Sequence, residues 1–187
     1  MKQNLVPALR LTLVTLVIFS GLYTLVLWAA AQALPTHGLG ERIERSEGGY
    51  FYANIGQVFT EERYFWSRPS AVDYNAAGSG GSNKGPTNPD YLATVQARID
   101  TFLAHHPGVR RADIPADLVT ASGSGLDPNI SPQAALVQAA RVAGARGLEV
   151  SRVEALVRQN TEPRLFGIFG KEKINVLRLN LALDAMK

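Results

Sequence analysis

The start of the chain is an apolar stretch that predicts a transmembrane helix. No Asp, Glu, Lys or Arg lies between Arg10 and Glu41, and residues 11–31 are 21 predominantly apolar positions. About 20 such residues in a helix cross the roughly 30 Å hydrocarbon layer of a bilayer. The small residues at 29–33 would also fit the cleavage site of a secretory signal, but the apolar region of a signal runs only about 7–15 residues. We therefore expect residues 11–33 to be retained as a single-pass transmembrane helix.

The charges that flank this stretch predict its orientation. Lys2 and Arg10 precede it, whereas Arg42 and Arg45 follow it among acidic residues. The Lys and Arg counts on the two sides are therefore close, but Arg10 directly borders the apolar run and favours a cytoplasmic N-terminus. This pattern predicts a cytoplasmic stub over residues 1–10 and a domain outside the cytoplasm.

Beyond the helix, the pattern predicts a linker and then an aromatic-rich segment. Gly and Pro punctuate residues 34–49, which indicates a linker ahead of a soluble domain over residues 50–187. Residues 50–74 contain 8 of the chain's 15 aromatic residues, in a spacing that favours short strands. These side chains would form either a core or a partner-binding face, since Tyr and Trp are enriched at protein interfaces.

Two helices are predicted with both of their ends. Residues 89–105 carry apolar positions along one side, with Asn88 as the N-cap and Pro at the first helical position. Residues 132–146 follow Ser131 in the same way, and Gly147 ends that helix.

The C-terminal part predicts one more helix and a strand. Ser151 and Glu154 have the spacing of a capping box, which favours a short helix to residue 160. Leucines then alternate with other residues over 177–183, which predicts a strand with one buried face. The soluble domain is therefore expected to be mixed helix and strand, of the α+β class.

Composition excludes several kinds of protein. The formal net charge of +3 falls to +1 without Lys2 and Arg10, because 17 Lys and Arg then face 16 Asp and Glu. The basic residues are scattered, so no nucleic-acid partner is expected. The chain has no cysteine, which excludes disulfides and thiolate catalysis. His105 and His106 are adjacent and lack spaced acidic partners, so we expect no metal site.

Two Gly/Ser-rich loops, residues 76–88 and 120–130, are the most unusual feature of the sequence. Each leads into a capped helix start, where free N–H groups could bind a phosphate or nucleotide; alternatively, Gly and Ser only satisfy tight turns. Arg68, Asp73 and Asp127 could form buried ion pairs that hold these loops, or they could face a partner subunit. A hydrolase using Ser122 or Ser124 with Asp127 is a further alternative, although no base is evident near them.

Several longer motifs resemble one known family along essentially the whole chain. They are Ile55-Gly56-Gln57 with Phe59, Tyr64-Phe65-Trp66-Ser67-Arg68-Pro69-Ser70, Tyr74-Asn75, Ser79-Gly80-Gly81-Ser82-Asn83, Gly85-Pro86-Thr87-Asn88-Pro89, Ser122-Gly123-Ser124-Gly125-Leu126-Asp127-Pro128, Ile130-Ser131-Pro132, Asn175-Val176-Leu177 and Leu179-Asn180-Leu181-Ala182-Leu183-Asp184. Their order and spacing resemble the C subunit of the bacterial Kdp potassium-transporting P-type ATPase.

The resemblance implies an accessory subunit of a high-affinity potassium uptake complex in the bacterial inner membrane. Its partners would be a channel-like potassium-binding subunit, a P-type ATP-hydrolysing subunit and a small single-helix subunit. The complex would use ATP, Mg and potassium, with no cofactor bound by this chain. The chain would support assembly and act as a catalytic chaperone that raises the ATP affinity of the ATP-hydrolysing subunit. It would not be an enzyme, and it lacks the DKTGT phosphorylation motif of P-type pumps.

The predicted orientation restricts how such a chaperone could act. A domain outside the cytoplasm could affect ATP affinity only through the membrane helices, whereas a cytoplasmic domain could bind nucleotide directly. A membrane-tethered extracytoplasmic hydrolase is the other alternative. The candidate partner- or nucleotide-binding residues are Gln57, Trp66, Arg68, Asp73, Asn75, Ser82, Asn83, Thr87, Asn88, Ser122, Ser124, Asp127 and Asn129.

Overall fold

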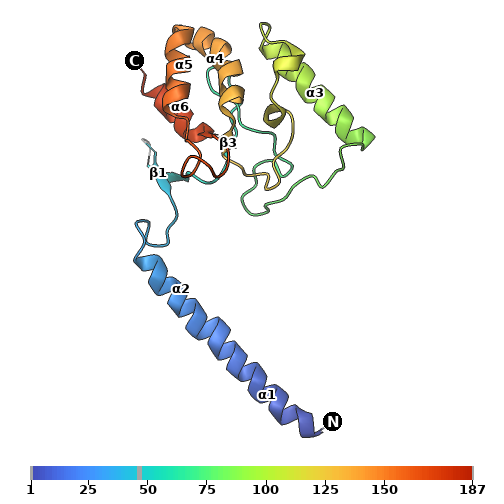
Figure 1. Ribbon diagram of the computed structural model, residues 1–187, viewed down its shortest axis with the longest axis vertical. Helices are drawn as coiled ribbons and strands as arrows, with labels where there is room; N and C mark the ends of the chain where they lie inside the picture. Colours follow the sequence, from blue (N-terminus) through green and yellow to red (C-terminus); the bar gives the residue numbers. More distant parts are fainter. Residues whose placement is uncertain (1, 46–47, 187) are drawn as a thin grey trace. The chain divides into compact units, whose positions relative to one another are not determined.

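The computed structural model describes residues 2–45 and 48–186. These residues form two compact units, Met1–Tyr52 and Ala53–Lys187, which are described separately below. The first unit is a long helix followed by a small hairpin. The second unit is a mixed helix and strand domain (Figure 1). The α+β class expected from the sequence is confirmed.

The N-terminal helix is continuous and apolar. It comprises α1 (Lys2–Leu16), a π-helical segment (Val17–Leu22) and α2 (Tyr23–Gln32). The stretch Asn4–Gln32 has a mean hydropathy of 2.1, so it is long and apolar enough to cross a membrane. The helix therefore begins well before the predicted residue 11, and the predicted stub is helical from Lys2 onward. Within the apolar stretch, hydroxyl groups donate to the helix's own carbonyls, as Thr12 does to Ala8 at 2.9 Å.

A short hairpin follows the helix. β1 (Arg42–Glu44) pairs antiparallel with β2 (Tyr50–Tyr52), which places Ile43 opposite Phe51. The predicted linker over 34–49 therefore contains a strand. Of the short strands favoured over residues 50–74, Tyr50–Tyr52 is the one that forms, and the rest of that segment contains neither strand nor helix.

The domain has four helices and one two-stranded sheet among the described residues. The helices α4, α5 and α6 lie together (Figure 1). The strands β3 and β4 pair antiparallel. The elements are α3 (Pro89–His105), two 3₁₀ turns (Arg111–Asp113 and Ala116–Leu118), β3 (Asn129–Ile130), α4 (Pro132–Arg146), α5 (Val150–Gln159), β4 (Ile174–Asn175) and α6 (Val176–Asp184).

The helix ends predicted for α3 and α4 are confirmed. The side chain of Asn88 accepts from the N–H of Tyr91 at 3.0 Å, and that of Ser131 accepts from Ala134 at 3.1 Å. Gly147 ends α4 with a φ of +65°, which a residue with a Cβ adopts at a cost.

Two local predictions are wrong. α5 begins at Val150 with Glu149 as its N-cap, so Ser151 lies inside the helix and forms no capping box. The predicted strand over 177–183 is instead helix α6, because Asn175 caps it by accepting from the N–H of Arg178 at 3.1 Å. A helix buries every third or fourth residue, and the buried positions of α6 follow that spacing.

The core lies between α4, α5 and α6 and is completed by residues from outside these helices. Small residues on the buried face of α4 allow the neighbouring elements to approach closely. The fully buried members include Phe65, Ala134, Ala135, Ala139, Val142, Ala143, Val153, Val157, Ile174, Val176, Leu179 and Leu183. Phe65 therefore anchors the aromatic segment in the core, although it belongs to no helix or strand.

The backbone around Phe65 is hydrogen-bonded by side chains instead of by a neighbouring strand. The Asn180 side chain on α6 accepts from the Phe65 N–H at 2.9 Å and donates to the Phe65 carbonyl at 3.0 Å. On α4, the Gln138 side chain accepts from the Trp66 N–H at 2.8 Å and donates to the Trp66 carbonyl at 3.3 Å. Buried backbone groups need such partners, which explains how this segment crosses the core without a sheet.

A buried arginine reinforces the same segment. The side chain of Arg141 is only 6% exposed, and its guanidinium donates to the carbonyls of Glu62 and Tyr64 and to the side chain of Gln138. The guanidinium also lies over the ring of Trp66, 4.5 Å from its centroid. This one buried cation thus joins α4 to Glu62, Tyr64 and Trp66 of the aromatic segment.

The fourth partner of Arg141 is a buried histidine. Its Nε donates to Nε2 of His106 at 2.8 Å, and Nδ1 of His106 lies 2.7 Å from the Phe102 carbonyl. This arrangement requires neutral imidazole with its proton on Nδ1. Burial, assisted by the charge of Arg141, lowers the pKa of His106 to about 4 despite the hydrogen bond to Phe102.

We predict that acid destabilises the domain through His106. The unfolded imidazole has the higher pKa, about 6.5, so the unfolded state binds more protons and the stabilisation present above pH 6.5 is lost as the pH falls toward 4. The expected loss is about 3 kcal/mol of unfolding free energy, measured by urea unfolding of the full chain in detergent at each pH.

Substitution separates this effect from other acid-sensitive groups. His106→Gln should remove this part of the pH dependence, whereas His105→Gln, on an exposed side chain, should keep it. An equal loss of stability between pH 6.5 and 4 in the His106→Gln variant and the original chain would contradict the assignment.

Candidate functional site

The two Gly/Ser-rich loops, predicted separately, lie against each other. The N–H of Gly80 donates to the carbonyl of Ser124 at 2.9 Å, and the hydroxyl of Ser79 donates to the same carbonyl at 2.9 Å. We call residues 79–81 and 123–125 the paired loops. The sequence indicates each loop but gives no sign of the contact, because more than forty residues separate them.

Glycine is required where the paired loops touch. A Cβ on Gly81 would lie 3.0 Å from the carbonyl oxygen of Gly123. A Cβ on Gly125 would lie 2.5 Å from Cγ2 of Val72 and 2.8 Å from the carbonyl oxygen of Gly80. Gly125 also has a φ of +69°. The glycines therefore allow close backbone packing, which supports the interpretation that Gly and Ser in these loops satisfy tight turns.

Two further segments fasten the paired loops to the domain. The N–H of Gly56 donates to the Leu126 carbonyl at 2.7 Å, and the hydroxyl of Ser70 donates to the Gly125 carbonyl at 2.7 Å. A Cβ on Gly56 would meet the Asp127 carbonyl at 2.8 Å, so this contact also requires glycine. Two segments outside the loops, around Gly56 and Ser70, therefore join the paired loops to the rest of the domain.

Of the predicted ion pairs, the one between Arg68 and Asp127 is confirmed. Their Nη1 and Oδ2 atoms lie 2.9 Å apart, with side chains 24% and 29% exposed. The other carboxylate oxygen of Asp127 accepts from the N–H of Asn129 at 3.0 Å and from its side-chain amide at 3.2 Å. Asp73 does not join this pair: it is exposed and has a φ of +49° in its turn.

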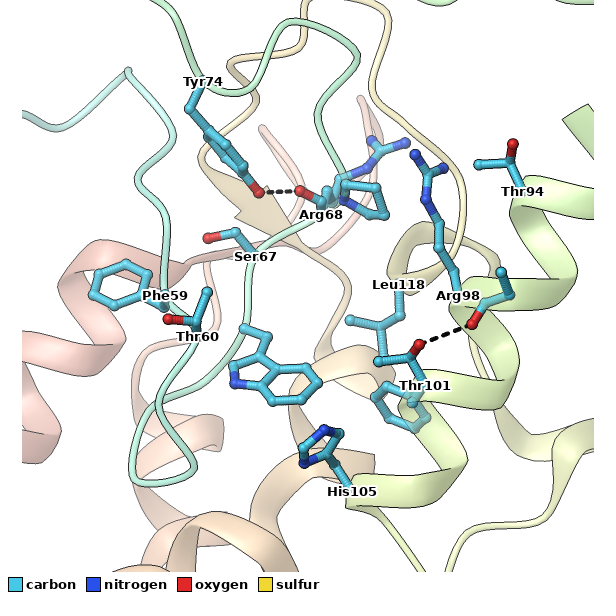
Figure 2. Close-up of a pocket in the computed structure, with 14 residues that line it drawn as sticks. Phe59, Thr60, Ser67, Arg68, Tyr74, Thr94, Arg98, Thr101, His105 and Leu118 are labelled. Carbon is cyan, nitrogen blue, oxygen red and sulfur yellow. Dashed lines mark hydrogen bonds between the residues drawn. The ribbon is translucent and has the colours of Figure 1, made fainter.

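An apolar pocket of about 540 Å³ lies between the aromatic segment and α3 (Figure 2). Phe59, Trp66 and Leu118 contribute apolar surface, and Figure 2 shows Arg68 and Arg98 at one end with His105 at the other. The Trp66 indole N–H donates to the Glu61 carbonyl at 3.1 Å. An apolar cavity with two guanidinium groups at one end suits an apolar group that carries a negative charge.

The surroundings of Arg68 and Arg98 limit how they could act there. Arg98 donates to the Val119 carbonyl at 3.1 Å, and Arg68 pairs with Asp127. Nε of Arg68 is buried and has no hydrogen-bond partner within the described part of the chain. Tyr74 closes this end, since its hydroxyl donates to the Arg68 carbonyl (Figure 2).

A second cavity, of about 500 Å³, also includes Arg68 in its lining, and most of its lining residues are polar or charged. Its charged lining mixes both signs, with Arg68, Lys171 and Lys173 near Asp117 and Asp127. Asn129 also lines it. A third cavity, of about 580 Å³, is lined in part by Ser122, Ser124 and Asp127.

The structure therefore brings some predicted site residues together and separates others. Trp66 and Arg68 share the apolar pocket, whereas Arg68, Asp127 and Asn129 share the polar one. The remaining residues have local roles or are exposed. Gln57 donates to the Ile55 carbonyl, Asn75 accepts from Ala77, Asn88 caps α3, and Ser82, Asn83 and Thr87 are exposed and line none of these three cavities.

The two candidate serines, Ser122 and Ser124, differ in burial and bonding. Ser122 is buried, and the Ser124 hydroxyl accepts from the N–H of Leu126 at 3.1 Å. Both nitrogens of His106 are already bonded, and across residues 2–45 and 48–186 no histidine is hydrogen-bonded to either serine. Over the same residues no group of three His, Asp or Glu side chains could hold a metal ion.

Sequence reasoning missed several residues that build this region. Three of them line the apolar pocket: Tyr74, Arg98 and His105. Three others hydrogen-bond to the aromatic segment beside the pocket: Gln138, Arg141 and Asn180. Gln138 and Asn180 do carry a sequence signal, because each interrupts the apolar face of a helix. Arg98 carries no comparable signal.

Residues 5–185 match the family described as "K+-transporting ATPase, c chain". The chain belongs to this family. The resemblance seen in the sequence motifs is therefore confirmed, and the chain is a subunit of a potassium-transporting ATPase complex.

Relatives in the family match along nearly their whole length. The chain is 54% identical over 188 residues to the "Potassium-transporting ATPase KdpC subunit" of Bacteroides fragilis (strain YCH46), covering 99% of this chain and 98% of that protein. It is 55% identical to the protein of the same name from Bacteroides thetaiotaomicron, covering 99% and 100%. For that of Flavobacterium johnsoniae the identity is 52% over 185 residues, covering 99% and 100%.

The close packing of the paired loops predicts unequal effects of two neighbouring glycine substitutions. Gly125→Ala must place a Cβ at positive φ and against Val72 and Gly80, so it should lower the unfolding free energy by at least about 2 kcal/mol. Gly123→Ala meets nothing within 4 Å and should stay within about 0.5 kcal/mol.

Urea unfolding of the full chain in detergent, with limited proteolysis of the loops, measures both variants. Equal stability and equal cleavage of the Gly125→Ala and Gly123→Ala variants would show that the paired loops do not pack as described.

Proposed function

We propose that this chain is a non-catalytic accessory subunit that supports assembly of the potassium-transporting complex and raises the ATP affinity of its ATP-hydrolysing subunit. The family match over residues 5–185 carries the proposal. The absence of a base beside Ser122 and Ser124 among the described residues supports a non-catalytic role. ATP, Mg and potassium would then be bound by other subunits.

The apolar helix is the element best suited to pack on partner subunits. Its large side chains, such as Leu13, Phe19 and Leu25, are exposed in the isolated chain. Small residues such as Ala29 could let a neighbouring helix approach closely. The proposed neighbours are the channel-like potassium-binding subunit, the ATP-hydrolysing subunit and the small single-helix subunit.

The apolar pocket is the proposed docking site outside the bilayer. Trp66 is half-buried, braced by Arg141 and hydrogen-bonded through its indole, so it is held in one position. Rigid Trp and Arg side chains in a pocket contribute most of the binding energy at many interfaces. Trp66, Arg68 and Arg98 are therefore the residues on which we expect a partner subunit to depend.

The proposed orientation places the N-terminus in the cytoplasm and the domain outside the inner membrane. Arg10 supports it, because Lys and Arg next to a membrane helix favour the cytoplasmic side. Coupling to ATP binding would then pass through the apolar helix and its neighbours. The domain itself would not touch nucleotide.

Cysteine labelling tests this orientation directly, since the chain has no cysteine. Ser151→Cys on exposed α5 should react with a membrane-impermeant maleimide in cells whose outer membrane alone is permeabilised. Asn4→Cys should react only after the inner membrane is opened. The reverse pattern would contradict the orientation and favour direct nucleotide binding by a cytoplasmic domain.

The chaperone role predicts that altering this chain weakens nucleotide binding by the complex. In the purified complex, replacing residues 4–32 with an unrelated apolar helix should raise the dissociation constant of a non-hydrolysable ATP analogue at least about 5-fold, the lower end of typical coupling energies. The isolated chain should not bind the analogue. Gln133→Ala, on an exposed position of α4, should leave the affinity unchanged.

Two results would count against this role. An unchanged dissociation constant in a complex that lacks the chain altogether would remove the chaperone proposal. Saturable binding of the analogue to the isolated chain would replace it with direct nucleotide binding.

A further inference from the structure

The loop between α5 and α6 is apolar and takes no part in the proposed function. Four large side chains at its tip are strongly exposed: Leu165 by 64%, Phe166 by 84%, Ile168 by 72% and Phe169 by 61%. None of the four lines the cavities described above. So much contiguous apolar surface on a soluble domain marks a place of contact with something other than water.

The tip is a defined turn. Leu165 and Phe169 exchange backbone hydrogen bonds of 2.9 and 3.0 Å, and Gly167 donates to the Arg164 carbonyl at 2.9 Å. Below it, Glu162 and Lys173 exchange bonds of 2.8 and 3.2 Å. The loop is therefore a short hairpin that holds its apolar side chains outward.

The backbone conformation at the tip is unfavourable for the residue it carries. Phe166 has a φ of +53°, a conformation that is rare for bulky side chains, and Gly167 follows at +76°. A strained residue of this kind persists where the surrounding structure enforces it, and such residues gather at functional sites. Phe166 is the most exposed Phe among the described residues.

The charges beside the tip favour an anionic surface. Arg164 immediately precedes it and Lys171 follows Gly170, so a cation stands on each side. The acids nearby are Glu162, which pairs with Lys173 at 3.3 Å, and Glu172. Apolar residues flanked by Arg and Lys are typical of segments that lie at the boundary between lipid headgroups and acyl chains.

The tether to the apolar helix limits how far the domain can lie from a bilayer. The apolar helix ends at Gln32, and the domain begins at Ala53. The residues between them span at most about 70 Å when fully extended, and the β1–β2 hairpin shortens that reach. Insertion of the tip would therefore be an intramolecular step at high effective concentration, where even a weak apolar contact is populated.

We propose that residues 164–171 are a membrane-contacting loop that inserts Phe166 and Ile168 into the headgroup region of an anionic bilayer on the side where the domain lies. The inserted length is a single turn, which matches the shallow depth that interfacial segments reach. The domain would then be held to the membrane at two points, the anchor helix and this loop. The proposal does not depend on the chaperone role.

Site-specific labelling of the full chain tests the loop. Ile168→Cys, labelled with an environment-sensitive fluorophore, is reconstituted by its own anchor into liposomes of phosphatidylglycerol and phosphatidylcholine. The matched control is Leu92→Cys, an exposed apolar position on α3. We expect a blue shift and strong quenching by lipids spin-labelled near the headgroup at position 168, and neither effect at position 92.

Two double variants test whether the apolar and the basic side chains of the loop are responsible for its contact with lipid. Phe166→Asp with Phe169→Asp should abolish the quenching at position 168. Arg164→Glu with Lys171→Glu should weaken it in anionic liposomes. Equal quenching at positions 168 and 92 would overturn the proposal. So would a blue shift at 168 that appears only after partner subunits are added and without lipid quenching, because a protein would then cover the tip.

Discussion

The domain depends on the hydrogen bonds by which two helix side chains hold an extended segment in the core. Asn180 and Gln138 each bond both the N–H and the carbonyl of one residue, Phe65 and Trp66 respectively. A neighbouring strand usually fills that role. Because amide side chains replace it, the segment can pass over α4 and α6 with Phe65 inserted and Trp66 turned toward α3. The apolar pocket and the Arg68–Asp127 pair both follow from the direction that the chain takes here.

Arg141 extends this arrangement and explains its acid sensitivity. The guanidinium is bonded to the aromatic segment and to His106, so it joins α4, α3 and the pocket wall. Protonation of His106 would remove the lone pair that accepts from Arg141 and place two cations in contact. The same contacts that position Trp66 for a partner are therefore the contacts that acid weakens.

The sequence predicted those features that are encoded locally. The caps at Asn88 and Ser131 determine where α3 and α4 begin, and both starts are confirmed. Alternating leucines at the C-terminus have the period of a strand, yet the segment is a helix that begins at the cap Asn175 and leaves Leu181 exposed. The contact between the paired loops could not be predicted, because it joins segments far apart through backbone atoms and glycines. The sequence indicated Arg68 and Asp127 as candidates for an ion pair, and the structure shows that they pair with each other.

The most direct test of this account is the stability of Asn180→Ala in the full chain, measured by urea unfolding in detergent and followed by tryptophan fluorescence. The substitution leaves the buried N–H and carbonyl of Phe65 without their partner, so the unfolding free energy should fall by roughly 2–6 kcal/mol, at about 1–3 kcal/mol for each unsatisfied group. Gln133→Ala, on the exposed face of α4, should change it by less than about 0.5 kcal/mol. A loss for Asn180→Ala no larger than that of Gln133→Ala would contradict the claim that side-chain amides hold the aromatic segment in place.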